Sequence, residues 1–120
     1  MRSLKSLTQD GWVASSVDDV IKDYGFMERW LKDIAWGGCR VKVFLHDKEG
    51  ARKYMLLMFT EKHQFDIIIT PTYMGCQMDN RYCEPFEDWT RGRDLADGKC
   101  NEETLGRILC DIINKELVIV

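Results

Sequence analysis

The sequence predicts an α+β fold, in which an antiparallel meander of three to four strands carries N- and C-terminal helices on one face. Two observations support this prediction. The middle of the chain holds closely spaced stretches with strand-like patterns, and stretches on either side of it place apolar residues at helical spacing. Strands that follow one another closely favour a meander. We therefore expect one domain of 120 residues with the order α-β-β-β-loop-α, and residues 1–10 are expected to fray.

Three strands are predicted in the middle of the chain. Cys39–His46 alternates apolar and other residues with the period of two that one buried face requires. Arg52–Glu61 has a continuous apolar middle, which favours a central strand covered on both sides. Phe65–Thr70 contains three consecutive isoleucines, and Pro71 then removes a backbone donor and would end the pairing. Tyr73–Met78 follows as a possible fourth strand.

Helices are predicted on both sides of these strands. The first begins after Ser15-Ser16, because serine is a good N-cap residue, and its apolar stripe runs to Ile34. Gly25 lies inside this pattern and would kink the helix or split it in two. Asn101 is predicted to cap the final helix. The apolar tail 117–120 could add an edge strand or pack onto a partner.

Composition and charge limit the classes of function. No apolar run approaches the roughly 20 residues of a membrane span, and the first ten residues lack the apolar core of a secretory signal. We therefore expect a cytoplasmic protein without membrane contact. Residues 75–103 hold eight acidic and four basic residues, a net of −4, so the other 91 residues sum to +1 within the total of −3. Nucleic-acid binding usually needs a basic patch, so no nucleic-acid partner is predicted.

The segment 79–97 is the main candidate for a binding site, because it interleaves carboxylates with aromatic side chains. Aromatic residues with a polar group are favoured at protein interfaces, and carboxylates would steer a basic partner towards them. Arg91 and Arg93 could instead pair with nearby carboxylates. The candidate residues are Asp79, Tyr82, Glu84, Phe86, Glu87, Asp88, Trp89, Asp94 and Asp97.

Catalytic and metal chemistry find weaker support, and no cofactor is predicted. Two of the carboxylates among Glu84, Glu87 and Asp88 could share a general acid–base site, but nothing fixes their separation. Cysteine ligands of zinc usually occur in C-x2-C pairs, and the sequence contains no such pair. The cysteines are therefore expected to be free thiols rather than metal ligands, although zinc could be held by Cys76, Cys83, Cys100 and His63.

The leading hypothesis is a non-enzymatic protein-binding module, for example an immunity- or antitoxin-like inhibitor, that engages a basic partner through segment 79–97. The alternative is a domain that binds a small molecule, with or without turnover, in a cleft between the sheet and this segment. Aromatic side chains could line that cleft, including those of Trp12, Trp30, Trp36 and Trp89. A homodimer is also expected if no element covers the sheet face that carries Phe44.

Overall fold

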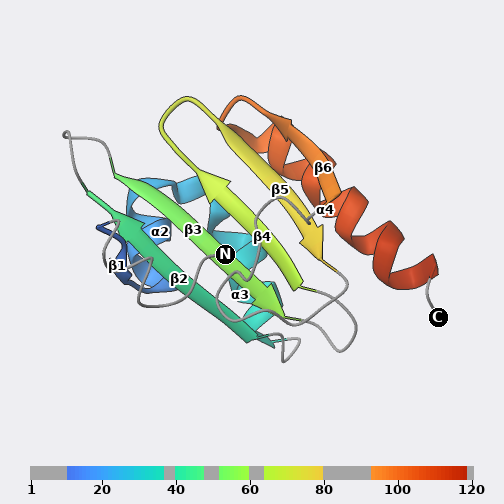
Figure 1. The fold of residues 1–120 in the computed structure, drawn as a ribbon, viewed down its shortest axis with the longest axis horizontal. Helices are drawn as coiled ribbons and strands as arrows, with labels where there is room; N and C mark the ends of the chain where they lie inside the picture. The colour runs from blue at the N-terminus through green and yellow to red at the C-terminus, as the bar shows by residue number, and fades with distance from the viewer. Residues whose placement is uncertain (1–10, 37–39, 48–51, 60–63, 80–92, 119–120) are drawn as a thin grey trace.

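The computed structural model describes residues 11–36, 40–47, 52–59, 64–79 and 93–118. Within these ranges the chain forms an antiparallel sheet packed against helices (Figure 1). The strands are β1 (Val13–Ala14), β2 (Arg40–His46), β3 (Lys53–Phe59), β4 (Gln64–Ile69), β5 (Met74–Asp79) and β6 (Arg93–Gly98). The helices are α2 (Val17–Asp23), the 3₁₀ turn η1 (Gly25–Met27), α3 (Glu28–Trp36) and α4 (Glu102–Val118).

The sheet has the order β1-β2-β3-β4-β5-β6, and every neighbouring pair is antiparallel. The predicted α+β class, antiparallel sheet and sequential strand order are therefore confirmed. The predicted number of strands is wrong, since the described residues form six rather than three or four.

The two extra strands are the outer ones. The sequence predicted a loop between the last strand and the final helix, yet Arg93–Gly98 pairs with β5 as β6. Apart from Leu95, its residues are charged, alanine or glycine and are unfavourable in a strand, so the pairing with β5 and the contact with α4 decide its conformation. At the other edge, the two residues of β1 pair with Leu45 and Phe44 of β2.

The helix boundaries follow local signals. The Ser16 side chain accepts a hydrogen bond from the Asp19 amide, which confirms the predicted N-cap of α2. The first helical stretch is split at Gly25, as the glycine suggested. The Asn101 side chain accepts from the Thr104 amide and caps α4. The tail is not an edge strand over residues 117–118, because α4 continues to Val118.

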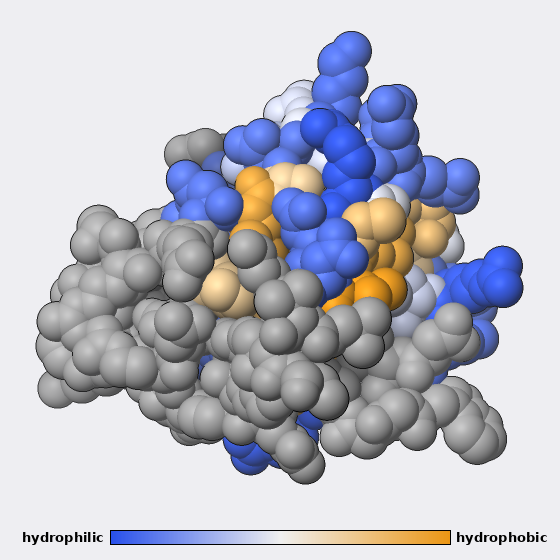
Figure 2. All heavy atoms as spheres, turned by 90° about the vertical axis from the view of Figure 1, so that its right-hand side faces the viewer, coloured by the Kyte–Doolittle hydropathy of each residue, from blue (hydrophilic) through white to orange (hydrophobic). Residues whose placement is uncertain are grey.

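The main core lies between one sheet face and the helices. The buried residues include Val20, Met27 and Leu31 from the N-terminal helical region and Leu105, Ile108 and Ile112 from α4, packed against alternate residues of the strands. Seen from the right-hand side of Figure 1, apolar areas are interrupted by polar side chains (Figure 2). The described residues contain no helix that is long and apolar enough to cross a membrane.

The second face of the sheet carries a smaller apolar cluster of Phe44, Met55, Leu57 and Phe59. Each of these side chains is at most 6% exposed within a single chain. β3 is thus buried on both faces, as its continuous apolar run predicted. A homodimer was expected if the sheet face around Phe44 were uncovered, but these four residues are already buried within a single chain. Homodimerisation itself stays a prediction.

Candidate functional site

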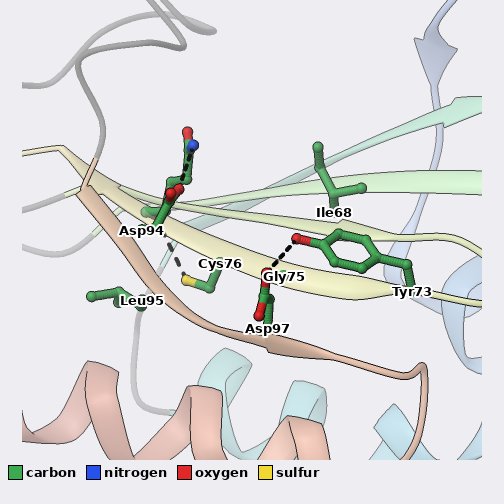
Figure 3. A pocket seen from close by; sticks show the side chains of 8 residues that line it. Ile68, Tyr73, Gly75, Cys76, Asp94, Leu95 and Asp97 are labelled. Atoms are coloured by element: carbon green, nitrogen blue, oxygen red, sulfur yellow. Dashed lines mark hydrogen bonds between the residues drawn. The ribbon is translucent and has the colours of Figure 1, made fainter.

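A pocket of about 300 Å³ opens between β5 and β6 (Figure 3). Asp94 and Asp97, two of the predicted binding residues, contribute to its lining from β6. Tyr73 and Gly75 contribute from the start of β5, and Ile68 contributes from β4. The pocket therefore joins carboxylates to an aromatic ring at one edge of the sheet.

An irregularity in β6 brings the two carboxylates together. Asp97 lies opposite Gly75, and Asp94 lies opposite Gln77. Between these two pairs β6 therefore advances by three residues, whereas β5 advances by two. This extra residue is a β-bulge. In a regular strand, residues three apart point to opposite faces, whereas here both aspartates stand opposite residues on the same face of β5.

Hydrogen bonds hold both carboxylates. The Tyr73 hydroxyl donates to Oδ2 of Asp97 at 3.2 Å, and Nε2 of Gln77 donates to Oδ1 of Asp94 at 2.8 Å. Both aspartates remain exposed to solvent. Burial, followed by the nearby Asp97 charge, raises the pKa of Tyr73 above its usual value of 10.0. The phenol therefore stays protonated at neutral pH and remains a donor to Asp97.

The position of Tyr73 depends on the turn before it and on Gly75. The Tyr73 carbonyl accepts hydrogen bonds from the Thr70 amide at 2.7 Å and from the Thr70 hydroxyl at 3.2 Å. A Cβ atom at position 75 would lie 2.9 Å from Cζ of Tyr73 and would clash with the ring. Glycine at this position thus lets the ring lie across the strand, where 41% of the residue is still exposed.

The far side of β6 is tied to α4. Nη2 of Arg107 donates to the Asp97 carbonyl at 3.1 Å, and a Cβ at position 98 would lie 2.7 Å from the same nitrogen. The hydrogen bond from Arg107 therefore holds the backbone that carries Asp97 against α4. The site consequently rests on a packed strand rather than on a free loop.

The cysteines do not assemble a site in the described residues. Cys76 is only 4% exposed and packs in the main core, where burial raises the pKa of its thiol well above the usual range. Cys100 is half-buried beside the same core. No group of three or more His, Cys, Asp or Glu residues suited to a metal ion occurs in the described ranges. Cys83 and His63 lie outside them.

Most of the predicted binding segment lies outside the described residues, including Tyr82, Glu84, Phe86, Glu87, Asp88 and Trp89. Asp79 ends β5 opposite Gln64, and its side chain is also outside the described part. Trp12 and Trp30 pack against different clusters on opposite faces of the sheet, so these two tryptophans do not line one pocket. The side chains of Trp36 and Trp89 are outside the described part.

Sequence reasoning missed Tyr73, Gly75 and Gln77, which complete the pocket. Gly75 carried a usable signal, because a glycine inside a strand often marks a close approach by another group. The bulge that aligns the aspartates had no clear signal in the sequence. A scan of protein-family models, a search of curated proteins and a search of solved structures each found no match.

Proposed function

We propose that this chain is a non-enzymatic protein-binding module that engages a basic partner through the acidic edge of its sheet. The observation that carries the proposal is the placement of Asp94 and Asp97 on one side of β6, beside the exposed ring of Tyr73. An aromatic ring with a polar group offers contact area at little entropic cost, and the carboxylates favour a lysine or arginine.

The pocket suits recognition better than turnover. Its described lining holds two carboxylates, a phenol that stays protonated and a buried thiol that also stays protonated. A thiol nucleophile reacts as the thiolate, and burial opposes that form here. A cationic side chain would instead find two fixed negative charges and the face of an aromatic ring, an arrangement that supports cation binding.

Affinity capture with three baits tests this proposal. The baits are the tagged wild-type chain, the Asp94→Asn, Asp97→Asn double variant, and Asp18→Asn, which removes an exposed carboxylate on α2. We expect a basic protein on the first and third baits but not on the second, and its capture should weaken with added salt. Identical proteins on all three baits would contradict the proposal.

A second candidate function is binding of a small organic cation. The pocket volume of about 300 Å³ lies at the lower end of the range for ligand sites, which favours a compact amine or guanidine. Thermal unfolding in the presence of such cations checks this alternative. A rise in Tm that vanishes in the double aspartate variant would support it, whereas a rise unaffected by that variant would place the ligand elsewhere.

A further inference from the structure

The opposite edge of the sheet is only half covered in the described residues. β1 is two residues long and lies beside the C-terminal end of β2 (Figure 1). The Ser15 amide makes one further hydrogen bond, to the Val43 carbonyl at 2.9 Å, before the chain turns away into α2. No described strand runs beside residues 40–42 on this side.

The direction of the backbone groups follows from that last hydrogen bond. The Val43 carbonyl accepts from the β1 side, so the N–H and C=O groups of Val43 point to the outer edge. Because these directions alternate along a strand, the N–H and C=O groups of Val41 also point outward. Backbone donors and acceptors that point outward from a strand are a template for another strand.

A groove of about 430 Å³ runs along this edge. Residues 14–17 form one wall, and residues 41–44 form the other. Val17 and Val41 are only partly buried, and both contact the main core. The groove therefore exposes the rim of the apolar core beside backbone groups that face outward, which is the combination that strand addition uses.

Charge selects among the possible occupants. Arg40 and Lys42 are exposed residues on the same face of β2, and both extend over the Phe59 ring. Cζ of Arg40 lies 5.1 Å from the ring centroid, and Nζ of Lys42 lies 5.7 Å from it. An antiparallel second copy centred on Val41 would place Arg40 opposite Lys42 of the other chain. Like charges directly opposite each other destabilise a strand pair, so a second copy is disfavoured.

We propose that the outer edge of β2, where β1 does not pair with it, binds an extended segment of an acidic partner protein, which adds a strand to the sheet. The carboxylates of this segment lie on the sheet face that carries Lys42, and its apolar side chains lie on the opposite face, beside Val41 and Val17. The expected pattern is therefore an alternation of acidic and β-branched or other apolar residues. This interface is separate from the acidic site on β6, and either could exist without the other.

Panning a display library of random linear peptides against the wild-type chain tests the proposal. We expect enrichment of peptides in which acidic and apolar residues alternate. Val41→Pro removes an N–H that faces outward and takes no part in the pairing with β3, so proline should be tolerated there. Lys42→Glu reverses the charge, and Lys99→Glu is the matched reversal near β6. Binding of the selected peptides should fall at least tenfold in the first two variants and stay unchanged in the third.

Two further measurements keep the result interpretable if a variant misfolds. Amide exchange of the wild-type chain with one selected peptide should slow at Val41 while the rest of the sheet is unaffected. Sedimentation of the peptide-free wild-type and Val41→Pro chains shows whether any self-association uses this edge. The proposal is overturned if no alternating acidic peptide is enriched, if such peptides bind Lys42→Glu as well as wild type, or if Val41 exchange is unchanged. It is also overturned if the chain self-associates and Val41→Pro abolishes the association, since a second copy would then be the occupant.

Discussion

The Tyr54 hydroxyl on β3 donates a hydrogen bond of 2.6 Å to Oδ2 of Asp23, the last residue of α2. Nε of Arg52 donates to the same carboxylate oxygen. Tyr54 is fully buried, whereas the Asp23 side chain is 24% exposed. The interaction therefore ties the first helix to the central strand through a charged acceptor at the border of the core.

Tyr54→Phe should lower the free energy of unfolding by about 1–3 kcal/mol, because the Asp23 carboxylate loses a donor while Arg52 remains. Tyr24→Phe is the matched control, since the Tyr24 hydroxyl donates to a neutral acceptor, the Arg52 carbonyl, at 3.0 Å. The control should cost about 0.5–1.5 kcal/mol. Urea unfolding measures both. Equal costs would show that the charge on Asp23 adds nothing to the Tyr54 hydrogen bond.

Stability should fall in acid in a way that depends on Asp23. The hydrogen bond from Tyr54 is the largest cause that lowers the pKa of Asp23 below its usual value of 3.8. The native state thus favours the carboxylate, and the resulting stabilisation is complete above the unfolded pKa and lost as pH falls through the folded pKa. The stability difference between wild type and Asp23→Asn should shrink from pH 6 to pH 3. A difference that is constant with pH would contradict this assignment.

Gly75→Ala should displace the Tyr73 ring from the pocket. The ring is exposed enough to swing outward, so we expect a loss of stability of no more than about 1 kcal/mol. The phenol would leave Asp97, and its pKa should return towards 10.0. Ultraviolet titration of the tyrosines, compared with Tyr73→Phe to identify the relevant step, measures this shift. An unchanged titration curve in Gly75→Ala would show that the alanine is accommodated without moving the ring.

The two faces of β3 should contribute similarly to stability. Leu56 packs in the main core, and Leu57 packs in the smaller cluster on the second face, at 1% and 0% exposure respectively. We expect Leu56→Ala and Leu57→Ala each to lower the free energy of unfolding by about 2–5 kcal/mol. Chemical unfolding of both variants measures the two costs. A cost for Leu57→Ala well below this range would mean that the second face is not a true core.

Two glycines near α4 should respond oppositely to alanine. A Cβ at Gly106 meets no atom within 4 Å, so Gly106→Ala should stabilise this helix by about 0.5–1 kcal/mol. A Cβ at Gly98 would lie 2.9 Å from Oγ1 of Thr104, a residue that is only 2% exposed, so Gly98→Ala should cost about 1–3 kcal/mol. Thermal unfolding should separate the two variants in opposite directions from wild type. Changes in Tm of the same sign for the two variants would contradict this prediction.

The inner strands and the helix starts could be predicted because their signals are local. The alternation in β2 and the isoleucines of β4 match the conformations that those residues favour. Ser16 and Asn101 cap their helices through contacts with residues three positions away. Such signals need no knowledge of distant parts of the chain.

The outer strand β6 and the pocket could not be predicted in the same way. Asp94, Asp97 and Gly98 are poor strand residues, and β6 forms because it pairs with β5 and packs against α4. The alignment of the two aspartates depends on one bulge, and Tyr73 reaches them across Gly75. These are relations between separate segments, so neither propensity nor spacing within one segment reveals them.

The order of the strands also bears on how the chain reaches its native state. From β2 to β5 each strand pairs with the strand that follows it after a short connection, so this part of the sheet can grow by one hairpin at a time, whereas α2 and α3 lie between β1 and β2 in the sequence. None of the described strands has to enter between two that are already paired. Hairpins close in roughly 1–10 μs, and a predominance of local pairings is associated with rapid folding. During synthesis, β1 to β5 can associate in the order in which they emerge, and the addition of β6 with α4 completes the sheet last.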